Sequence, residues 1–303
     1  MDERVKVLKT YKLFIDGAFP RSESGRSLQV KDATGATLAH LCMASRKDLR
    51  DAVEAARRAY EKWAGATAYN RGQVLYRIAE MMEGKADELA GAIASTGFVK
   101  APQARREVGA AVDRMIYYAG WADKYAQVLG CNNPVAGPYY NFTVMRPTGV
   151  VACICPRSNP LLGLVSMIAP VIVSGNAVVA VDGGENPIPA AVFAEVCATS
   201  DVPPGVVNIL TGKREELCNV IASHRDIDAV HAASADAAEI EALRAGAASN
   251  LKRVTIRREA SGMSDAKAKG HPHQIDWFTE GCQSVYWIEP FVEAKTIWHP
   301  SSV

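Results

Sequence analysis

The second half of the chain alternates short β-branched runs with stretches of helical periodicity, and this alternation limits the fold more than any other feature of the sequence. The expected strands are residues 150–155, 177–181, 206–210, 229–231 and 253–256. The expected helices between them are residues 161–174, 189–199, 214–223 and 235–248. Four consecutive strand–helix units require a parallel sheet with crossover helices, so the sequence predicts a doubly wound, Rossmann-like α/β fold.

The first half of the chain is expected to be mainly helical. Residues 11–26 alternate as a short hairpin does, with a turn at Asp16 and Gly17. Helical spacing of apolar residues begins after Ser45, which is placed to cap the first helix. The expected helices cover residues 48–63, 74–82, 89–93 and 103–125.

The remaining segments predict a loop, three strands and a connection. Gly, Asn and Pro at residues 130–138 predict a loop, and an alternating aromatic strand follows at 139–145. After Ile256 the periodicity fails, and residues 257–272, rich in Ala, Gly, Lys and Ser, are expected to form a surface connection. Further strands are expected at residues 285–288 and 294–298.

Charge and composition exclude several classes of partner. Lys and Arg total 34 against 33 Asp and Glu, and this near balance disfavours nucleic acids and anionic membranes as partners. The longest apolar stretch, residues 161–173, is shorter than the roughly 20 residues that cross a bilayer. The first residues are charged and do not form a secretory leader. Seven cysteines without framework spacing fit free thiols in a reducing cytosol, so a cytoplasmic location is expected.

Several phrases, in order and at Rossmann spacing, resemble the aldehyde dehydrogenase superfamily. Residues 147–156 with 159–162 resemble the strand that leads to its Pro-Trp-Asn-Phe-Pro motif. Residues 174–179 and 202–212 resemble its Gly-Asn and Pro-Pro-Gly-Val-x-Asn signatures. The resemblance extends from about residue 11 to 255 and to the end of the chain. It implies an N-terminal helical segment, a doubly wound parallel sheet and a small β oligomerisation element.

The resemblance also implies where chemistry would lie. The family oxidises an aldehyde with a cysteine thiolate, an oxyanion-binding Asn, a Glu base and a nicotinamide cofactor held by a Lys and a glycine-rich helix start. The matched positions hold Ser158 for the oxyanion Asn, with Asn159 one position away, Val181 for the Lys, Ser234 for a glycine that approaches the cofactor, and Arg257 for the Glu. Asp182 and Glu185 would in addition repel phosphates. Fold-making positions match while chemical positions differ, and this selective loss favours a pseudoenzyme.

The resemblance further implies a missing catalytic domain. Residues 292–298 resemble the terminal strand of the family, yet they follow Ile256 too closely for a catalytic domain to lie between. Residues 250–252 and 296–300 resemble the degenerate second domain of the branch that carries two aldehyde dehydrogenase domains in one polypeptide. The expected division of the chain is 1–137 for the N-terminal hairpin and helices, 138–148 for a β segment of the oligomerisation element, 149–265 for the Rossmann-like sheet, 266–284 for a connection and 285–303 for the C-terminal strands.

Cysteine and histidine residues offer few sites. Cys282 lies in a scrambled form of the family's Gly-Gln-x-Cys sequence, without a His or Lys spaced to activate it, so a structural role is favoured and Cys282 remains the fallback nucleophile. Cys153 and Cys155 share one face of an expected strand and fit the core better than a metal site. His271 and His273 lack companions at ligand spacing and are expected to be solvated, so no metal is expected.

One weak anion site and one interface remain. Thr211, Gly212 and Lys213, followed by Arg214, open a helix that could receive an anion, although a solvated helix start is favoured. The interface expected from the two β segments consists of Tyr140, Phe142, Val144, Thr296 and Trp298. In the family the matching hairpin builds the subunit contact, and an exposed strand of this composition would aggregate unless covered.

Two functional classes follow. The first is a non-catalytic module that pairs with itself, as a homo-oligomer, or with a catalytic aldehyde dehydrogenase domain, and that needs no cofactor. The alternative is an NAD(P)-dependent aldehyde oxidoreductase with a non-standard site. The altered residues at the matched positions favour the first class.

Overall fold

A parallel sheet forms the centre of the protein in the computed structural model, which describes residues 7–259 and 274–301. Its six strands lie in the order β11-β10-β9-β6-β7-β8, and all neighbours are parallel. They are β6 (Val150–Ile154), β7 (Ala177–Asp182), β8 (Val207–Thr211), β9 (Ala229–Ala233), β10 (Arg253–Glu259) and β11 (Gln274–Ile275). The doubly wound, Rossmann-like fold predicted from the alternating runs is therefore confirmed.

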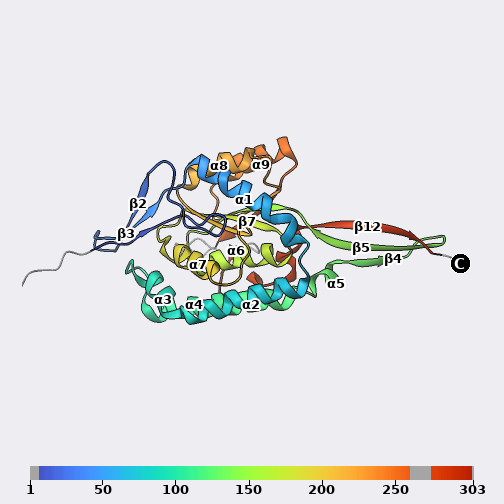
Figure 1. The fold of residues 1–303 in the computed structure, drawn as a ribbon, viewed down its shortest axis with the longest axis horizontal. Helices are drawn as coiled ribbons and strands as arrows, with labels where there is room; N and C mark the ends of the chain where they lie inside the picture. Colours follow the sequence, from blue (N-terminus) through green and yellow to red (C-terminus); the bar gives the residue numbers. More distant parts are fainter. Residues whose placement is uncertain (1–6, 260–273, 302–303) are drawn as a thin grey trace, which may run out of the picture.

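Helices cover both faces of this sheet (Figure 1). One face packs on α1 (Arg46–Ala64), α8 (Arg214–Ser223) and α9 (Ala237–Asn250). The other packs on α6 (Leu162–Val173) and α7 (Ile188–Ala198), with α2 (Ala68–Gly84), α3 (Ala86–Ala94) and α4 (Ala101–Trp121) outside them. Sheet strands that are buried on both faces explain the continuous Val, Ile and Ala runs of the sequence.

In the N-terminal region the expected turn and helix cap are present, but the hairpin expected over residues 11–26 is limited to contacts beside the turn. Tyr11 instead pairs in parallel with Leu41. Ile15 and Ala18 exchange both backbone hydrogen bonds across the turn at Asp16 and Gly17, and both turn residues have positive φ. Ser45 caps α1, because its hydroxyl accepts hydrogen bonds from the amides of Lys47 and Asp48. A small sheet with the order β1-β3-β2 is built from β1 (Thr10–Tyr11), β2 (Ser27–Lys31) and β3 (Thr37–Cys42).

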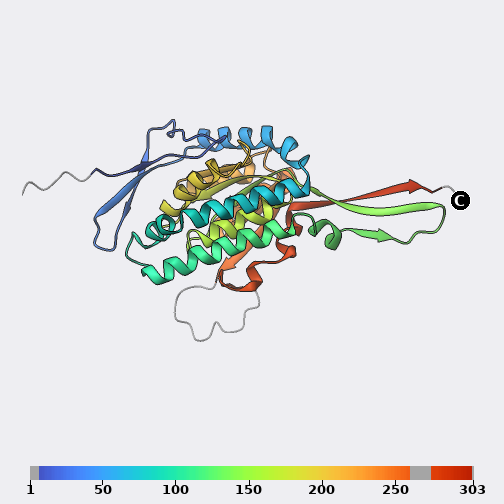
Figure 2. The same cartoon turned by 60° about the horizontal axis from the view of Figure 1, so that its bottom comes forward.

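A second three-stranded sheet projects from the body as an arm (Figures 1 and 2). Its order is β12-β5-β4, with β5 (Tyr139–Pro147) antiparallel to both neighbours, β4 (Cys131–Asn133) and β12 (Val292–Pro300). The strands expected at 139–145 and 294–298 therefore pair with each other. Residues 131–133 were expected in a loop, and this expectation is wrong, because pairing with β5 makes a strand from residues of low β propensity.

Two further boundaries differ from expectation. The expected helix 103–125 is divided into α4 and α5 (Tyr125–Leu129). Strand β10 continues to Glu259, beyond the point where a connection was expected. Most of that connection, with His271 and His273, lies outside the described residues.

The strand expected at residues 285–288 is wrong. These residues lie in consecutive 3-10 turns, η2 (Val285–Trp287) and η3 (Glu289–Phe291), which follow η1 (Glu280–Cys282). The Ser284 hydroxyl caps η2 by accepting from the amide of Tyr286, and Pro290 stands within η3. The apolar side chains therefore reach the core from turns and not from a strand.

No helix in the described part of the chain is long and apolar enough to span a bilayer.

Candidate functional site

The crevice where a doubly wound sheet binds its ligand lies between β6 and β9. The chain passes from β6 to β7 and β8 on one side and then to β9 and β10 on the other, so the strand order reverses between β6 and β9. Ligands of open α/β sheets bind at the carboxyl ends of the strands at such a point. Here those ends are marked by Cys155, which follows β6, and Ala233, the last residue of β9.

The side chain of Arg214 lies across this crevice. Arg214 is the first residue of α8 and is 2% exposed. Its Nη1 donates to the carbonyl oxygen of Cys155 at 3.2 Å, and its Nη2 donates to that of Ala233 at 2.9 Å. A Cβ atom on Gly183 would come within 2.6 Å of Arg214 Cγ, so the side chain also packs directly on the loop after β7.

Glu239 on α9 completes a buried ion pair with Arg214. Glu239 Oε2 lies 3.0 Å from Arg214 Nη2, with the two side chains 5% and 1% exposed. The same oxygen accepts a hydrogen bond from the amide of Asp236, whose side chain caps α9 in return. From the sequence, Arg214 is expected as a solvated cation at a helix start, whereas the structure directs it inward.

Asp182 adds a second buried carboxylate at the same edge. It ends β7, is 3% exposed and accepts a hydrogen bond from the amide of Gly184 at 2.9 Å. Its Oδ2 atom has no hydrogen-bond partner among the described residues. Burial raises the pKa of Asp182 to about 6, against the opposing effects of the Gly184 hydrogen bond and the Arg214 charge.

We expect Asp182→Asn to stabilise the protein at neutral pH by up to about 3 kcal/mol. The folded state holds the Asp182 proton more tightly than the unfolded state, so ionisation costs stability as the pH rises from about 4 to 6. The asparagine keeps an acceptor for the amide of Gly184 and removes the charge. Urea denaturation at a series of pH values measures the gain, which should vanish near pH 4. A gain that is equal at every pH would contradict this assignment.

Ser234 is matched to a glycine of the family, and its backbone conformation is one that favours glycine. Ser234 has a φ of +51°, in the left-handed region. Its hydroxyl accepts from the amide of Arg157 at 3.4 Å, and its own amide donates to the carbonyl of Arg257. The serine thus bridges the loops after β6 and β9, next to Arg214.

The loop after β6 holds Ser158 and Asn159 at the start of α6. The amides of Leu161 and Leu162 at this helix start donate to one carboxylate oxygen of Glu107, at 2.9 and 3.1 Å. Glu107 is 2% exposed, and burial raises its pKa. The amides at this helix start are therefore hydrogen-bonded to a carboxylate of the protein itself. No pattern in the sequence indicates this contact.

Arg257 lies at the matched position of the general base. Its Nε donates to Nε2 of His231 at 3.1 Å, and its guanidinium stacks on Trp287 at 3.9 Å. Nδ1 of His231 donates in turn to the carbonyl of Met167, so the imidazole is neutral, and burial lowers its pKa well below the usual value. A guanidinium cannot accept the proton that a base must remove.

Cys282 lies in η1 and is 2% exposed. Its Sγ donates to the carbonyl of Asp276 at 3.1 Å, and burial raises the pKa of the thiol. Arg114 holds the surrounding segment, because its Nη1 and Nη2 donate to the carbonyls of Cys282 and Trp277. Cys282 and Arg257 also line an open cavity of about 670 Å³. The thiol thus lies near a cavity, and burial outweighs the charges of Arg114 and Arg257, which act to lower its pKa.

Two donors of the expected anion site already have partners within the protein. Gly212 donates its amide to the carbonyl of Asp182, and the Thr211 hydroxyl donates to the carbonyl of Cys42. Lys213 is exposed and precedes α8 without a capping bond.

Cys153 and Cys155 are both fully enclosed in the core, where burial raises their pKa values. The described residues contain no cluster of side chains suited to a metal.

The five expected interface residues divide between the two faces of the arm. Residues paired across β5 and β12 point to one side, so Tyr140, Phe142 and Val144 share a face with Ile297. Thr296 and Trp298 lie on the opposite face, whose side chains form a polar ladder: Asn133 donates to Asn141 and Thr143, and the hydroxyls of Thr143 and Thr296 lie 3.0 Å apart. The first face therefore combines these apolar side chains with His299 and Lys295, and the second combines Trp298 with the hydrogen-bonded ladder.

The sheet, its crossover helices and the crevice define an α/β protein of the dinucleotide-binding architecture. The model of the aldehyde dehydrogenase family matches residues 19–265, and the chain belongs to this family.

Curated relatives and solved structures agree with this assignment. A putative aldehyde dehydrogenase of Bacillus subtilis is 32% identical over 252 residues, which cover 82% of this chain and 50% of that protein. Retinal dehydrogenase 2 of Mus musculus is 36% identical over 256 residues, 82% of this chain and 48% of its own length. The NAD+ complex of an aldehyde dehydrogenase from Bacillus cereus superposes with a TM-score of 0.78 at 29% identity, covering 85% of this chain and 53% of the other. The chain spans about half the length of the curated relatives it matches.

Proposed function

We propose that this protein is a non-catalytic aldehyde-dehydrogenase-like module that acts by association through its arm, with a second copy of itself or with a catalytic aldehyde dehydrogenase domain. It needs no cofactor for this role. Two features of the molecule support this role: the crevice is filled by the protein's own side chains, and the arm is exposed and largely uncharged.

The observation that carries the proposal is the position of Arg214. A dinucleotide would have to occupy the ends of β6 and β9, where the guanidinium now bonds to the carbonyls of Cys155 and Ala233. Displacing it would leave Glu239 buried without its counter-charge, at a cost of several kcal/mol. Val181 at the ribose position and the unpartnered Asp182 oxygen oppose the same ligand. The residues present do not fit NAD or NADP.

The groups at the positions of the nucleophile and the base also support a non-catalytic role. Oxidation of an aldehyde needs a thiolate and a base, and Cys282 has a raised pKa while Arg257 is a cation. Each such group is worth orders of magnitude in rate. Association remains as the property for which the arm is suited, since Tyr140 and Trp298 are 51% and 58% exposed.

We expect no reduction of NAD or NADP above background with a panel of aldehydes, and no saturable heat when NAD is titrated into the protein in a calorimeter. The control is Cys282→Ser, which should leave both measurements unchanged. Turnover that disappears in Cys282→Ser, or a dissociation constant for NAD in the low micromolar range, would favour the alternative of an NAD(P)-dependent oxidoreductase with a non-standard site.

A further inference from the structure

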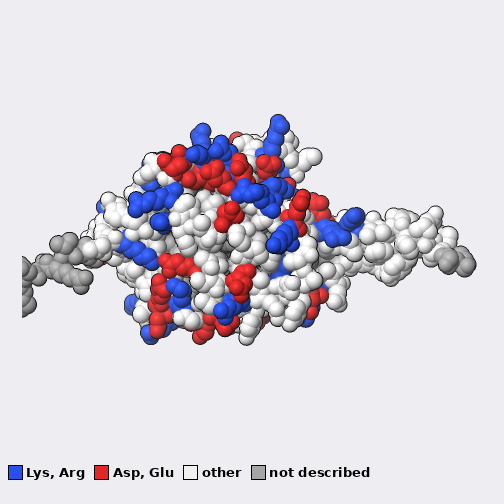
Figure 3. Space-filling view, in the orientation of Figure 1, with Lys and Arg blue, Asp and Glu red and all other residues white. Residues whose placement is uncertain are grey.

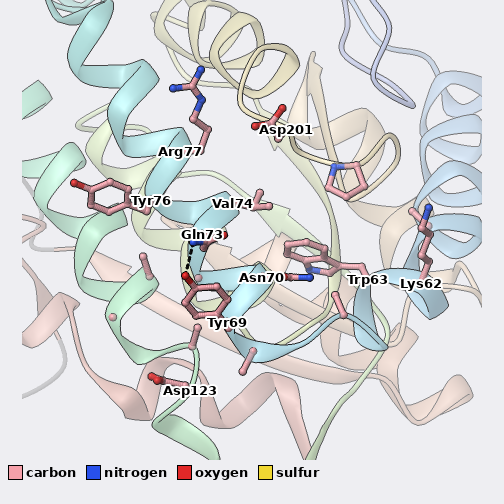
Figure 4. A pocket seen from close by; sticks show the side chains of 18 of the residues that line it. Lys62, Trp63, Tyr69, Asn70, Gln73, Val74, Tyr76, Arg77, Asp123 and Asp201 are labelled. Atoms are coloured by element: carbon pink, nitrogen blue, oxygen red, sulfur yellow. Dashed lines mark hydrogen bonds between the residues drawn. The ribbon is translucent and has the colours of Figure 1, made fainter.

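An open groove lies where α1, α2 and the end of α4 meet (Figure 4). Its volume is about 1090 Å³, and its lining is mostly apolar. Trp63 forms part of it, with Nε1 donating to the carbonyl of Ile172, and Tyr69, Tyr76 and Ile116 stand at its rim with 68%, 59% and 42% exposure. Exposed apolar surface of this extent is typical of a contact with another protein.

The charges around the groove are largely paired with each other. Arg58 lies 3.1 Å from Asp16, Arg77 lies 2.7 Å from Glu80, and Lys124 lies 3.3 Å from Asp123. The groove therefore offers apolar contact without a strong field of either sign. Its natural occupant is an uncharged, aromatic segment.

The arm's tip has this chemistry. Residues 131–145 contain no charged side chain, and on the face seen in Figure 3 the arm beyond its root shows neither acidic nor basic atoms. The tip carries Tyr139, Tyr140 and Trp298, each about half exposed, with the rings of Tyr139 and Trp298 in edge contact at 5.8 Å. Aromatic side chains at such an end form the kind of anchor that dominates protein interfaces.

The groove lies at the root of the arm. Asp123 and Lys124 in its wall directly precede α5, which leads into β4. On the other side, the Tyr60 hydroxyl of α1 donates to the carbonyl of Pro147, the last residue of β5. The arm itself, at nine residues per long strand, extends about 30 Å from this root to its tip. A chain cannot bend this paired sheet back into its own groove.

We infer that two copies of this chain associate with their arms antiparallel, so that the aromatic tip of each arm lies in the groove at the root of the other. This inference rests on the proposed function and names the surface that the arm contacts. With a two-fold axis at the middle of the paired arms, the tip of each copy lies at the root of the other. Both grooves are then filled, and the assembly closes as a dimer. The groove and the tip thereby cover each other's exposed aromatic side chains.

The first test changes the groove without touching the arm. Ile116→Glu places a charge in the apolar groove from an exposed position and should raise the dissociation constant of the dimer at least about tenfold, measured by sedimentation. Phe98→Glu is the matched control, because Phe98 is 68% exposed and does not line the groove. It should leave the dissociation constant unchanged.

The second test places the contact directly. In a Cys131→Ser background, protein with Tyr140→Cys or Trp298→Cys is mixed with protein carrying Gln73→Cys, and disulfide-linked pairs are counted after mild oxidation. Linked pairs between tip and groove are expected, and a pair of Tyr140→Cys with Phe98→Cys should not form. A dimer that forms no tip–groove link and ignores Ile116→Glu would overturn this inference and leave association through the arm standing. A chain that is monomeric at all concentrations would overturn both.

Discussion

Glu239→Ala should lower the free energy of unfolding by about 3–5 kcal/mol, because it leaves the guanidinium of Arg214 buried without its ion-pair partner. Arg214 is 2% exposed, and its pairing with Glu239 at 3.0 Å is enclosed by the ends of β6 and β9. The substitution also removes the acceptor for the amide of Asp236, which weakens the cap of α9. Urea denaturation of wild type and variant measures the loss.

Two further variants make this result specific. Glu241→Ala lies on the same helix at an exposed position and should change stability by less than about 0.5 kcal/mol. Replacing both partners, with Arg214→Met and Glu239→Leu, should recover much of the loss, because neither member of the ion pair is then left buried without the other. If Glu239→Ala lowers the free energy of unfolding no more than Glu241→Ala does, the ion pair does not close the crevice.

Thr143→Pro should weaken association of the chain by about a hundredfold or more. Thr143 lies at the middle of β5, opposite Cys131 of β4 and Thr296 of β12. Proline removes a backbone donor from the central strand of the arm, where no neighbour can replace it, and removes the hydroxyl that bonds Asn133 and Thr296. The dissociation constant from sedimentation measures the effect, which corresponds to roughly 3 kcal/mol.

The control for Thr143→Pro keeps the backbone donor. Thr143→Val removes only the hydroxyl and should reduce association much less. Because the arm projects from the body (Figure 2), both variants should unfold at nearly the wild-type urea concentration. Equal association of wild type and Thr143→Pro would show that the contact lies elsewhere on the molecule.

The sheet and its helices could be predicted because each strand carries its own signal. Residues 150–154 and 177–182 are apolar runs bounded by turn residues, and burial on both faces requires such runs. The cap at Ser45 is equally local. The strand predicted at residues 285–288 is wrong because its signal is not local. The β-branched and aromatic side chains there pack into the core from 3-10 turns, and this packing depends on the surrounding fold. Residues 131–133 form a strand only because β5 lies beside them.

The candidate site could be predicted only in part. The loss of a glycine at Ser234 could be recognised from the resemblance, and the positive φ there gives its physical meaning. The inward direction of Arg214 could not, since a cation at a helix start usually points to solvent. Its orientation depends on Glu239 and on two carbonyls from separate strands. Likewise, the two faces of the arm follow from the register of β5 and β12, which no single segment contains.

The central claim is that the protein acts by association through its arm. The most direct test is the molar mass of the wild-type chain by light scattering over a wide range of concentration, alone and mixed with a catalytic aldehyde dehydrogenase domain from the same source. We predict a mass of at least two chains of 32.6 kDa, or a stable complex with the catalytic domain. A mass of one chain at every concentration, unaffected by the catalytic domain, would contradict the account.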